Sequence, residues 1–244
     1  TTSSRRIPPR VSGTARLIAS SGRPPAHVSD SRVDEERPTT DQTHQQNVWR
    51  STAGQHWVAA RTMLDQTYKP LEDLLTNAVA AASATSVLDV GCGTGATTIA
   101  VARRLAAEGN CLGIDISEDM IAAARARAEH EGVSASFVCA DAQRHPFAAN
   151  SFDMCISRFG VMFFDDTVRA IANLRSAAAP GAALCWVAWR GPEENAFMLT
   201  AERVAEPFLP GVSTRVPNEP GQFGLADRMR VHELLTRGGW HDID

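Results

Sequence analysis

Apolar positions along the chain follow two alternating periods, and this alternation predicts a layered α/β fold. Short runs in which nearly every residue is apolar predict buried strands at 86–90, 111–115, 135–140, 152–157 and 183–189. Helical patterns lie between them at 96–107, 118–130 and 167–178. Strands that are apolar throughout and alternate with helices indicate a doubly wound, mostly parallel Rossmann-like sheet covered on both faces.

Local signals set the ends of several helices. Ser117 is a predicted N-cap, and the acidic residues that follow it suit the first turn of a helix. Before the first strand, the pattern predicts N-terminal helices from about residue 45, with a break at Gly54. Pro70 is predicted to stand at the first position of the second of these helices.

Residues 1–44 differ from the rest of the chain. They are rich in Ser, Arg and Pro, and no acidic residue occurs before Asp30. No helical or strand period runs through them, so they are predicted to form a disordered tail before a domain at 45–244. A transit peptide or an artefact of upstream sequence are the alternatives, and prolines at 8, 9, 24 and 25 count against the amphipathic helix of a transit peptide.

The C-terminal end predicts an incomplete sheet. Residues 228–236 read as a helix capped by Asp227, after which Trp240 and Ile243 are expected to begin a strand. The C-terminal strands are therefore expected to be truncated, which would leave the strand at 183–189 with an open edge. An open edge favours pairing with another chain, so aggregation or marginal stability is expected.

Composition narrows the classes of partner. The chain has 244 residues, 43% hydrophobic and 21% charged, with a formal net charge of −4. This charge gives no electrostatic reason to expect a nucleic acid or a membrane surface as partner, and no apolar run is long enough for a membrane span. The five cysteines contain no CxxC pair, so free thiols in a reducing, cytoplasmic compartment are favoured over disulfides or a metal site. The pattern leaves the oligomeric state open.

The stretch VLDVGCGTG at 87–95 carries the first candidate chemistry. Gly91, Gly93 and Gly95 form a turn from a strand into a helix, where a ligand can approach bare backbone near the positive helix end. The glycines alone would equally suit a dinucleotide. Asp89 favours a ligand that carries an ammonium group, because a pyrophosphate would repel its carboxylate. Alternatively, Asp89 hydrogen-bonds the N–H groups of the glycine loop itself.

Two more acids follow at the carboxyl ends of strands, where open α/β sheets bind ligands. Asp115 could accept both ribose hydroxyls of a nucleoside, and Asp141 with the next backbone N–H could meet an adenine edge. Either acid alone could be a helix cap. Three acids after three successive strands, together with the glycines, form a more specific pattern.

On these residues the sequence resembles class I S-adenosylmethionine-dependent methyltransferases over about residues 45–244. LDVGCGTG is similar to the family's first motif, GID to its ribose-binding acid, and ADAQ…PF…SFD to its adenine loop and fourth strand. SRFGVMFFDD and PGAALCWVAWR resemble motifs of the subgroup that contains the ubiquinone and menaquinone biosynthesis methyltransferases.

The resemblance implies that the cofactor is S-adenosyl-L-methionine and that the chain is a methyltransferase. It implies that Asp115 binds ribose, that Asp141 and Ala142 bind adenine, and that Gly91 to Gly95 pack along the homocysteine–ribose part. Ile116 would stack on adenine, or it is a core residue at a strand end. The predicted cofactor-binding residues are Asp89, Gly91, Cys92, Gly93, Gly95, Asp115, Ile116, Asp141, Ala142 and Ser157.

The acceptor is less well defined. A small, apolar molecule is expected, and Met162, Phe163 and Phe164 could wall its pocket or be core. No general base is evident; the positional candidates are His145, Arg158 and Trp49. An NAD-type oxidoreductase or a non-catalytic nucleotide-binding domain are the alternatives, although Tyr68 is the only tyrosine and the Tyr-x-x-x-Lys arrangement is absent.

Overall fold

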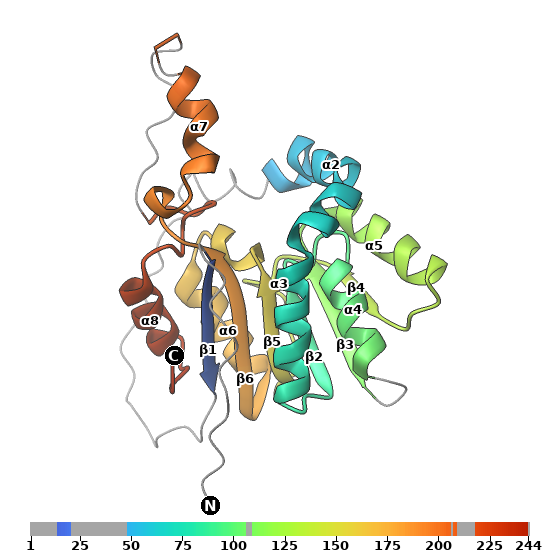
Figure 1. Ribbon diagram of the computed structural model, residues 1–244. Helices are drawn as coiled ribbons and strands as arrows, with labels where there is room; N and C mark the ends of the chain where they lie inside the picture. The colour runs from blue at the N-terminus through green and yellow to red at the C-terminus, as the bar shows by residue number, and fades with distance from the viewer. Residues whose placement is uncertain (1–13, 21–47, 106–108, 206, 209–217, 244) are drawn as a thin grey trace, which may run out of the picture.

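A six-stranded sheet forms the centre of the computed structural model, which describes residues 14–20, 48–105, 109–205, 207–208 and 218–243 (Figure 1). The strand order is β1-β6-β5-β2-β3-β4. The parallel strands are β2 (Ser86–Val90), β3 (Asn110–Asp115), β4 (Ser136–Cys139), β5 (Phe152–Arg158) and β6 (Ala178–Trp189). These five strands confirm the predicted doubly wound parallel sheet. Their order places the carboxyl ends of β2, β3 and β5 side by side.

Helices cover both faces of this sheet. On one face lie α3 (Arg61–Ala81), α4 (Ala96–Leu105) and α5 (Glu118–His130), and on the other lie α6 (Thr167–Ala177) and α8 (Arg228–Arg237) (Figure 1). The short α2 (Thr52–Ala59) packs against α5, whereas α7 (Ala196–Ala205) extends away from the sheet (Figure 1). Two short 3₁₀ segments, η2 (Gly160–Phe163) and η3 (Pro192–Glu194), follow β5 and β6. None of the helices in the described ranges is both long enough and apolar enough to cross a membrane.

Predicted caps at two helix starts are confirmed. The Ser117 side chain accepts a hydrogen bond from the Met120 N–H at the start of α5. Asp227 accepts hydrogen bonds from the N–H groups of Met229 and Arg230 at the start of α8. Both caps satisfy N–H groups that have no partner within the helix.

The N-terminal helices differ from the prediction at two positions. Pro70 lies inside α3 and not at its start. Both Pro70 and Gln66, whose carbonyl loses its helical partner, are exposed, so water can replace the missing hydrogen bond. Gly54 lies within α2 and is buried. A Cβ at this position would stand 2.5 Å from the Ser117 Oγ. Gly54 is therefore a point of close helix packing, and the predicted break was wrong.

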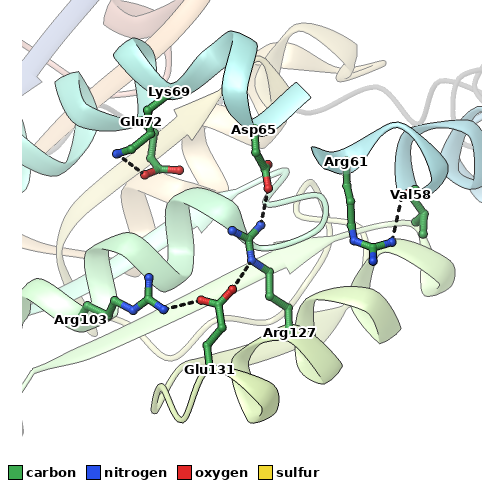
Figure 2. Close-up of polar contacts among 8 residues, drawn as sticks. All are labelled: Val58, Arg61, Asp65, Lys69, Glu72, Arg103, Arg127 and Glu131. Carbon is green, nitrogen blue, oxygen red and sulfur yellow. Dashed lines mark hydrogen bonds and ion pairs between the residues drawn. The ribbon is translucent and has the colours of Figure 1, made fainter. Parts of the chain in front are cut away.

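Ion pairs tie the helices on one face together, as Figure 2 shows. Arg127 of α5 contacts Asp65 of α3 at 2.7 Å and Glu131 at 2.9 Å. Arg103 of α4 contacts the same Glu131 at 2.5 Å. Exposed pairs add little energy singly, but this network connects three helices and fixes α3 relative to α5.

The edge of β6 is covered by a strand that the sequence did not predict. Residues Thr14–Ser20 form β1, which runs antiparallel to β6 from Thr14 opposite Trp189 to Ser20 opposite Ala183. This corrects the disorder prediction for these seven residues, and it corrects the open edge predicted for 183–189. Backbone pairing with an exposed strand needs no side-chain period in the added segment. The rest of the predicted tail lies outside the described residues.

Deleting residues 1–20 should uncover the edge of β6 without affecting the cofactor site. We expect a lower unfolding midpoint, by about 5 °C, and greater self-association, because the backbone groups of β6 lose their partners. Thermal melting and light scattering would measure both effects, with S-adenosylhomocysteine binding as the control. An unchanged midpoint in a monomeric protein would show that β1 contributes nothing to stability.

Trp240 packs as core, and the residues after it form only an isolated bridge at His241 and no strand within the described range. Trp240, expected to start one, is 1% exposed, and its Nε1 donates a hydrogen bond to the Ile171 carbonyl of α6 at 3.4 Å. Val231 and Leu235 of α8 are buried with it. The burial of its large ring decides the position of Trp240, and the sequence pattern alone does not reveal this burial.

Candidate active site

A cavity lies at the carboxyl ends of β2, β3, β4 and β5, with α2 at its rim. It encloses about 1070 Å³ of empty space, including the part open to solvent. Eight of the ten predicted cofactor-binding residues line it: Asp89, Gly91, Cys92, Gly93, Asp115, Ile116, Asp141 and Ala142. The structure therefore brings together residues from three separate strand ends, as the topology predicted.

The glycine turn gives the cavity a floor of bare backbone. Gly91 and Gly93 have φ values of 68° and 55°, which favour glycine. A Cβ on Gly91 would stand 2.5 Å from the Cα of Gly160, so this turn presses against the turn after β5. A Cβ on Gly93 would meet no atom closer than 3.7 Å, which leaves room for a ligand at this point.

Gly95 and Ser157, the other two predicted residues, do not line the cavity. A Cβ on Gly95 would stand 2.9 Å from the Cβ of Ala124, so Gly95 permits close packing of α4 and α5. Ser157 is fully buried; its Oγ donates to the Val90 carbonyl at 2.7 Å and accepts from the Gly160 N–H at 3.2 Å. Both residues shape the turns that bear the site, and we do not propose them as cofactor contacts.

Asp89 is 1% exposed, and its Oδ2 accepts a hydrogen bond from the Thr98 hydroxyl at 2.7 Å. Burial raises the pKa of Asp89 to about 6, although the Thr98 hydrogen bond and the charge of Arg158 act in the opposite direction. Hydrogen bonds to the glycine loop were the alternative role for Asp89, and among the described residues the Thr98 hydroxyl of α4 is the side-chain partner of this carboxylate. Asp89 is thus an ionisable group in the cavity wall whose charge a cationic ligand would stabilise.

Asp115 connects two backbone segments of the site. Its Oδ2 accepts from the Gly93 N–H and its Oδ1 accepts from the Ser117 N–H, each at 2.9 Å. Burial raises the pKa of Asp115, and these backbone donors oppose the shift. Each oxygen of a carboxylate has two acceptor positions, so capacity remains for two hydroxyl donors from a ligand.

The segment after β4 is fixed by side-chain amides. Asp141 Oδ1 accepts from the backbone N–H and the Nε2 of Gln143, at 2.9 and 3.1 Å. Asn173 of α6 donates to the carbonyls of Ala142 and His145, at 2.9 and 3.0 Å. His145 does not line the cavity, and its ring packs edge-on against Phe147. His145 is therefore a loop residue outside the described lining of the cavity.

Aromatic rings form the rest of the cavity wall. The Trp49 ring packs edge-on against Trp57 at 5.9 Å and against Phe163 at 4.9 Å, measured between ring centroids. On the side of β6, Phe159 stacks on Trp189 at 4.5 Å with an interplanar angle of 5°. Phe159 has φ 68°, a strained conformation for a residue with a side chain, and such strain is concentrated at functional sites.

The segment 162–164 contributes both to the core and to the cavity wall, the two interpretations that the sequence allowed. Met162 and Phe164 are buried in the main core, and all three residues of the segment also line the cavity. Sequence reasoning missed Thr97, whose buried Oγ1 has no hydrogen-bond partner among the described residues and lies in the first turn of α4. It also missed Trp57, Phe159 and Trp189. Position at a strand end was the available signal for Phe159 and Trp189.

A glycine turn after the first parallel strand, with carboxylates at the ends of the next two, defines a Rossmann-like site for a nucleoside cofactor. The cavity has features that fit S-adenosylmethionine: open backbone at Gly93, spare acceptor capacity on Asp115 and the unpartnered Thr97 hydroxyl. Tyr68 lies in α3 with its ring edge-on to Phe159, outside the described lining of the cavity.

Comparisons with known proteins agree with this class. Residues 87–181 match a family described as a methyltransferase domain. The chain is 30% identical over 170 residues to the ubiquinone/menaquinone biosynthesis C-methyltransferase UbiE of Cupriavidus necator, covering 65% of this chain and 68% of the relative. It is 27% identical over 149 residues to the enzyme of the same name from Marinomonas sp., covering 60% of this chain. The chain belongs to the class I S-adenosylmethionine-dependent methyltransferase family.

The extent of these matches differs between relatives. The chain spans 59% of the length of the Marinomonas relative. Among solved structures, the [4+2]-cyclase SpnF has a TM-score of 0.57 at 22% identity, over 78% of this chain and 72% of that chain. This likeness supports the fold alone. Because that neighbour is named as a cyclase, function has to be argued from the site.

Proposed function

We propose that this protein transfers a methyl group from S-adenosylmethionine to a small, largely apolar acceptor. The observation that carries the proposal is that one cavity joins two unlike surfaces. The glycine turn with Asp89, Asp115 and Asp141 suits a cationic nucleoside, and the wall of Trp49, Phe159 and other rings suits an apolar planar molecule. Similarity to relatives named as C-methyltransferases supports the same reaction.

In this proposal, different residues of the cavity bind different parts of the cofactor. Asp115 accepts the ribose hydroxyls, and Asp89 faces the ammonium group. Asp141 and the backbone of Ala142 meet the adenine edge, with Ile116 against the ring. Gly91, Cys92 and Gly93 allow close approach of the chain. The bound cofactor supplies an activated sulfonium methyl group, which an acceptor nucleophile takes while the C–S electrons return to sulfur.

The protein contributes orientation and exclusion of water. Holding two reactants in line can supply about 7–11 kcal/mol of the barrier. Apart from Asp89, Asp115, Asp141 and Arg158, the side chains of the described cavity lining carry no formal charge. The aromatic wall therefore acts on the acceptor by packing, and it keeps water from the reacting atoms.

Calorimetric titration tests the proposed function. S-adenosylmethionine and S-adenosylhomocysteine should each bind, and NAD should not. A screen of acceptors with methyl-labelled cofactor would then identify the substrate. Tight NAD binding without S-adenosylmethionine binding would overturn the proposal.

The affinity for S-adenosylmethionine should depend on pH through Asp89. Its folded-state pKa is raised from 3.8 to about 6, so the carboxylate is mostly charged only above that pH. As pH falls through 6, protonation removes the negative charge that the cationic ligand requires, and affinity should fall by up to about tenfold per pH unit. Titrations from pH 5 to 8 would measure this slope.

Asp89→Asn is the matched variant for that experiment. It keeps the size of the side chain and cannot titrate, so its affinity should be low at every pH and the slope near pH 6 should disappear. Identical slopes in the two proteins would assign the titration to another group.

We also propose that the protein works in a reducing, cytoplasmic compartment. All five cysteines are free; Cys139 is exposed and the others are buried. Burial raises the pKa of the Cys155 thiol to about 12, which makes this thiol unreactive. An exposed free thiol such as Cys139 persists where disulfide exchange is suppressed.

A further inference from the structure

Arg158 is the one cation in the described lining of the cavity, and one of its nitrogens has no hydrogen-bond partner among the described residues. It is the last residue of β5, at the sheet edge where the strand ends meet. Its Nη1 is buried and has no hydrogen-bond partner among the described residues. A buried donor without an acceptor costs free energy, and a charged donor costs more than a neutral one.

The nearest carboxylate does not neutralise this group. The charge of Arg158 acts on Asp89, yet no ion pair within 4.0 Å joins them in the described part of the chain. The Oδ2 of Asp89 is taken by the Thr98 hydroxyl. Arg158 therefore lines the cavity and has donor capacity that no described side chain uses.

An aromatic cluster lies beside this donor. The Arg158 Cζ lies 5.8 Å from the centroid of the Tyr68 ring, which packs edge-on against Phe159 at 5.2 Å and Trp189 at 6.1 Å. One cation set among flat apolar surfaces is complementary to a conjugated molecule with a single negative oxygen. A guanidinium fork suits such an oxygen, since it offers several donors in one plane.

We propose that Arg158 determines acceptor specificity by donating hydrogen bonds to a negatively charged oxygen of the methyl acceptor. This inference rests on the proposed methyl transfer. A carboxylate and an ionised hydroxyl on a conjugated ring share the required chemistry. The oxygen would fix the rotation of the acceptor within the aromatic wall, so that one atom of the ring system faces the methyl group.

Binding of defined probes tests this proposal. The probes are 2-naphthoate and its neutral counterpart 2-naphthamide, titrated by calorimetry into protein saturated with S-adenosylhomocysteine. The wild-type protein should bind 2-naphthoate about tenfold or more tightly than 2-naphthamide, a difference that one charged hydrogen bond can supply. A third probe, 2-naphthol, titrated below and above its own ionisation, distinguishes a phenolate from a carboxylate as the preferred oxygen.

Two substitutions test whether the preference for 2-naphthoate depends on the Arg158 side chain. Arg158→Met keeps most of the length without charge, and it should lose about tenfold in 2-naphthoate affinity but less than about twofold for 2-naphthamide. Arg158→Lys keeps the charge without the planar guanidinium, so it should recover part of the preference for 2-naphthoate. This variant also tests the proposal if Arg158→Met does not fold. Arg61→Met, at an exposed position on α3, makes the same change of charge as a control and should leave both affinities unchanged.

The affinity for S-adenosylhomocysteine distinguishes a failure of the Arg158 proposal from a failure of the proposed methyl transfer. Measured at pH 8, where Asp89 is charged, it should change by less than about twofold in the Arg158 variants, which would leave the cofactor site intact. A large loss of this affinity would assign Arg158 to the cofactor carboxylate and overturn the proposal. Equal binding of the two naphthalene probes to wild type, or binding of neither, would also overturn it. Failure of wild type to bind S-adenosylhomocysteine would instead contradict the proposed methyl transfer.

Discussion

Replacing Asp115 with Asn should weaken S-adenosylhomocysteine binding by about 10- to 100-fold. The carboxylate is proposed to accept two ribose hydroxyls, and hydrogen bonds to a charged acceptor contribute about 1.5–3 kcal/mol each. An amide retains one acceptor oxygen, but it turns an NH₂ group toward a backbone N–H or a hydroxyl that needs an acceptor. Isothermal calorimetry at pH 7.5 would measure the loss.

The fold itself should change little in this variant, because two effects oppose one another. The substituted amide cannot accept from both the Gly93 and the Ser117 N–H groups, as the Asp115 carboxylate does at 2.9 Å. However, burial raises the pKa of Asp115, so the buried charge is itself unfavourable and its removal is a gain. The unfolding midpoint without ligand should therefore move by only a few degrees.

Asp119→Asn is the matched control, since it makes the same change at an exposed position in the first turn of α5. It should leave the cofactor affinity unchanged. Unchanged affinity in a folded Asp115→Asn protein would reduce Asp115 to a structural acceptor for the two backbone segments.

Local patterns were sufficient for the central part of the fold. The strands at 86–90 and 152–157 and the helix at 118–130 appear within one residue of their predicted bounds. Each carries its own period and end signals, such as the Ser117 cap. The three acids also follow from sequence, because a strand end in a parallel sheet fixes the edge at which a side chain lies.

Features that depend on distant partners could not be predicted this way. β1 exists through pairing with β6, more than a hundred and sixty positions later in the chain. Gly95 and Ser157 belong to the right turns, but their surroundings are protein on every side. The unsatisfied Nη1 of Arg158 becomes visible only when every neighbouring acceptor is placed. The period of apolar positions predicts which face of a helix or strand a residue occupies, but it does not predict which residues pack against that face.

Replacing Trp240 with Ala should destabilise the protein by about 3–5 kcal/mol, the usual cost of removing a large buried aromatic side chain. Trp240 is 1% exposed, and it connects the segment after α8 to α6 through its hydrogen bond to the Ile171 carbonyl. The Arg175 Cζ lies 5.8 Å from the centroid of its ring, which adds a cation–π contact. Truncation would leave a cavity between the two helices and remove the indole donor from the Ile171 carbonyl.

Urea unfolding would measure this loss, and Met229→Ala is its control because Met229 lies on α8 but is 78% exposed. The control should change stability by less than about 0.5 kcal/mol. Trp240→Phe should give an intermediate loss, since it restores part of the buried area without the indole N–H. If Trp240→Ala cost less than about 1 kcal/mol, the C-terminal segment would not be part of the core, and its anchoring of α8 on α6 would have to be abandoned.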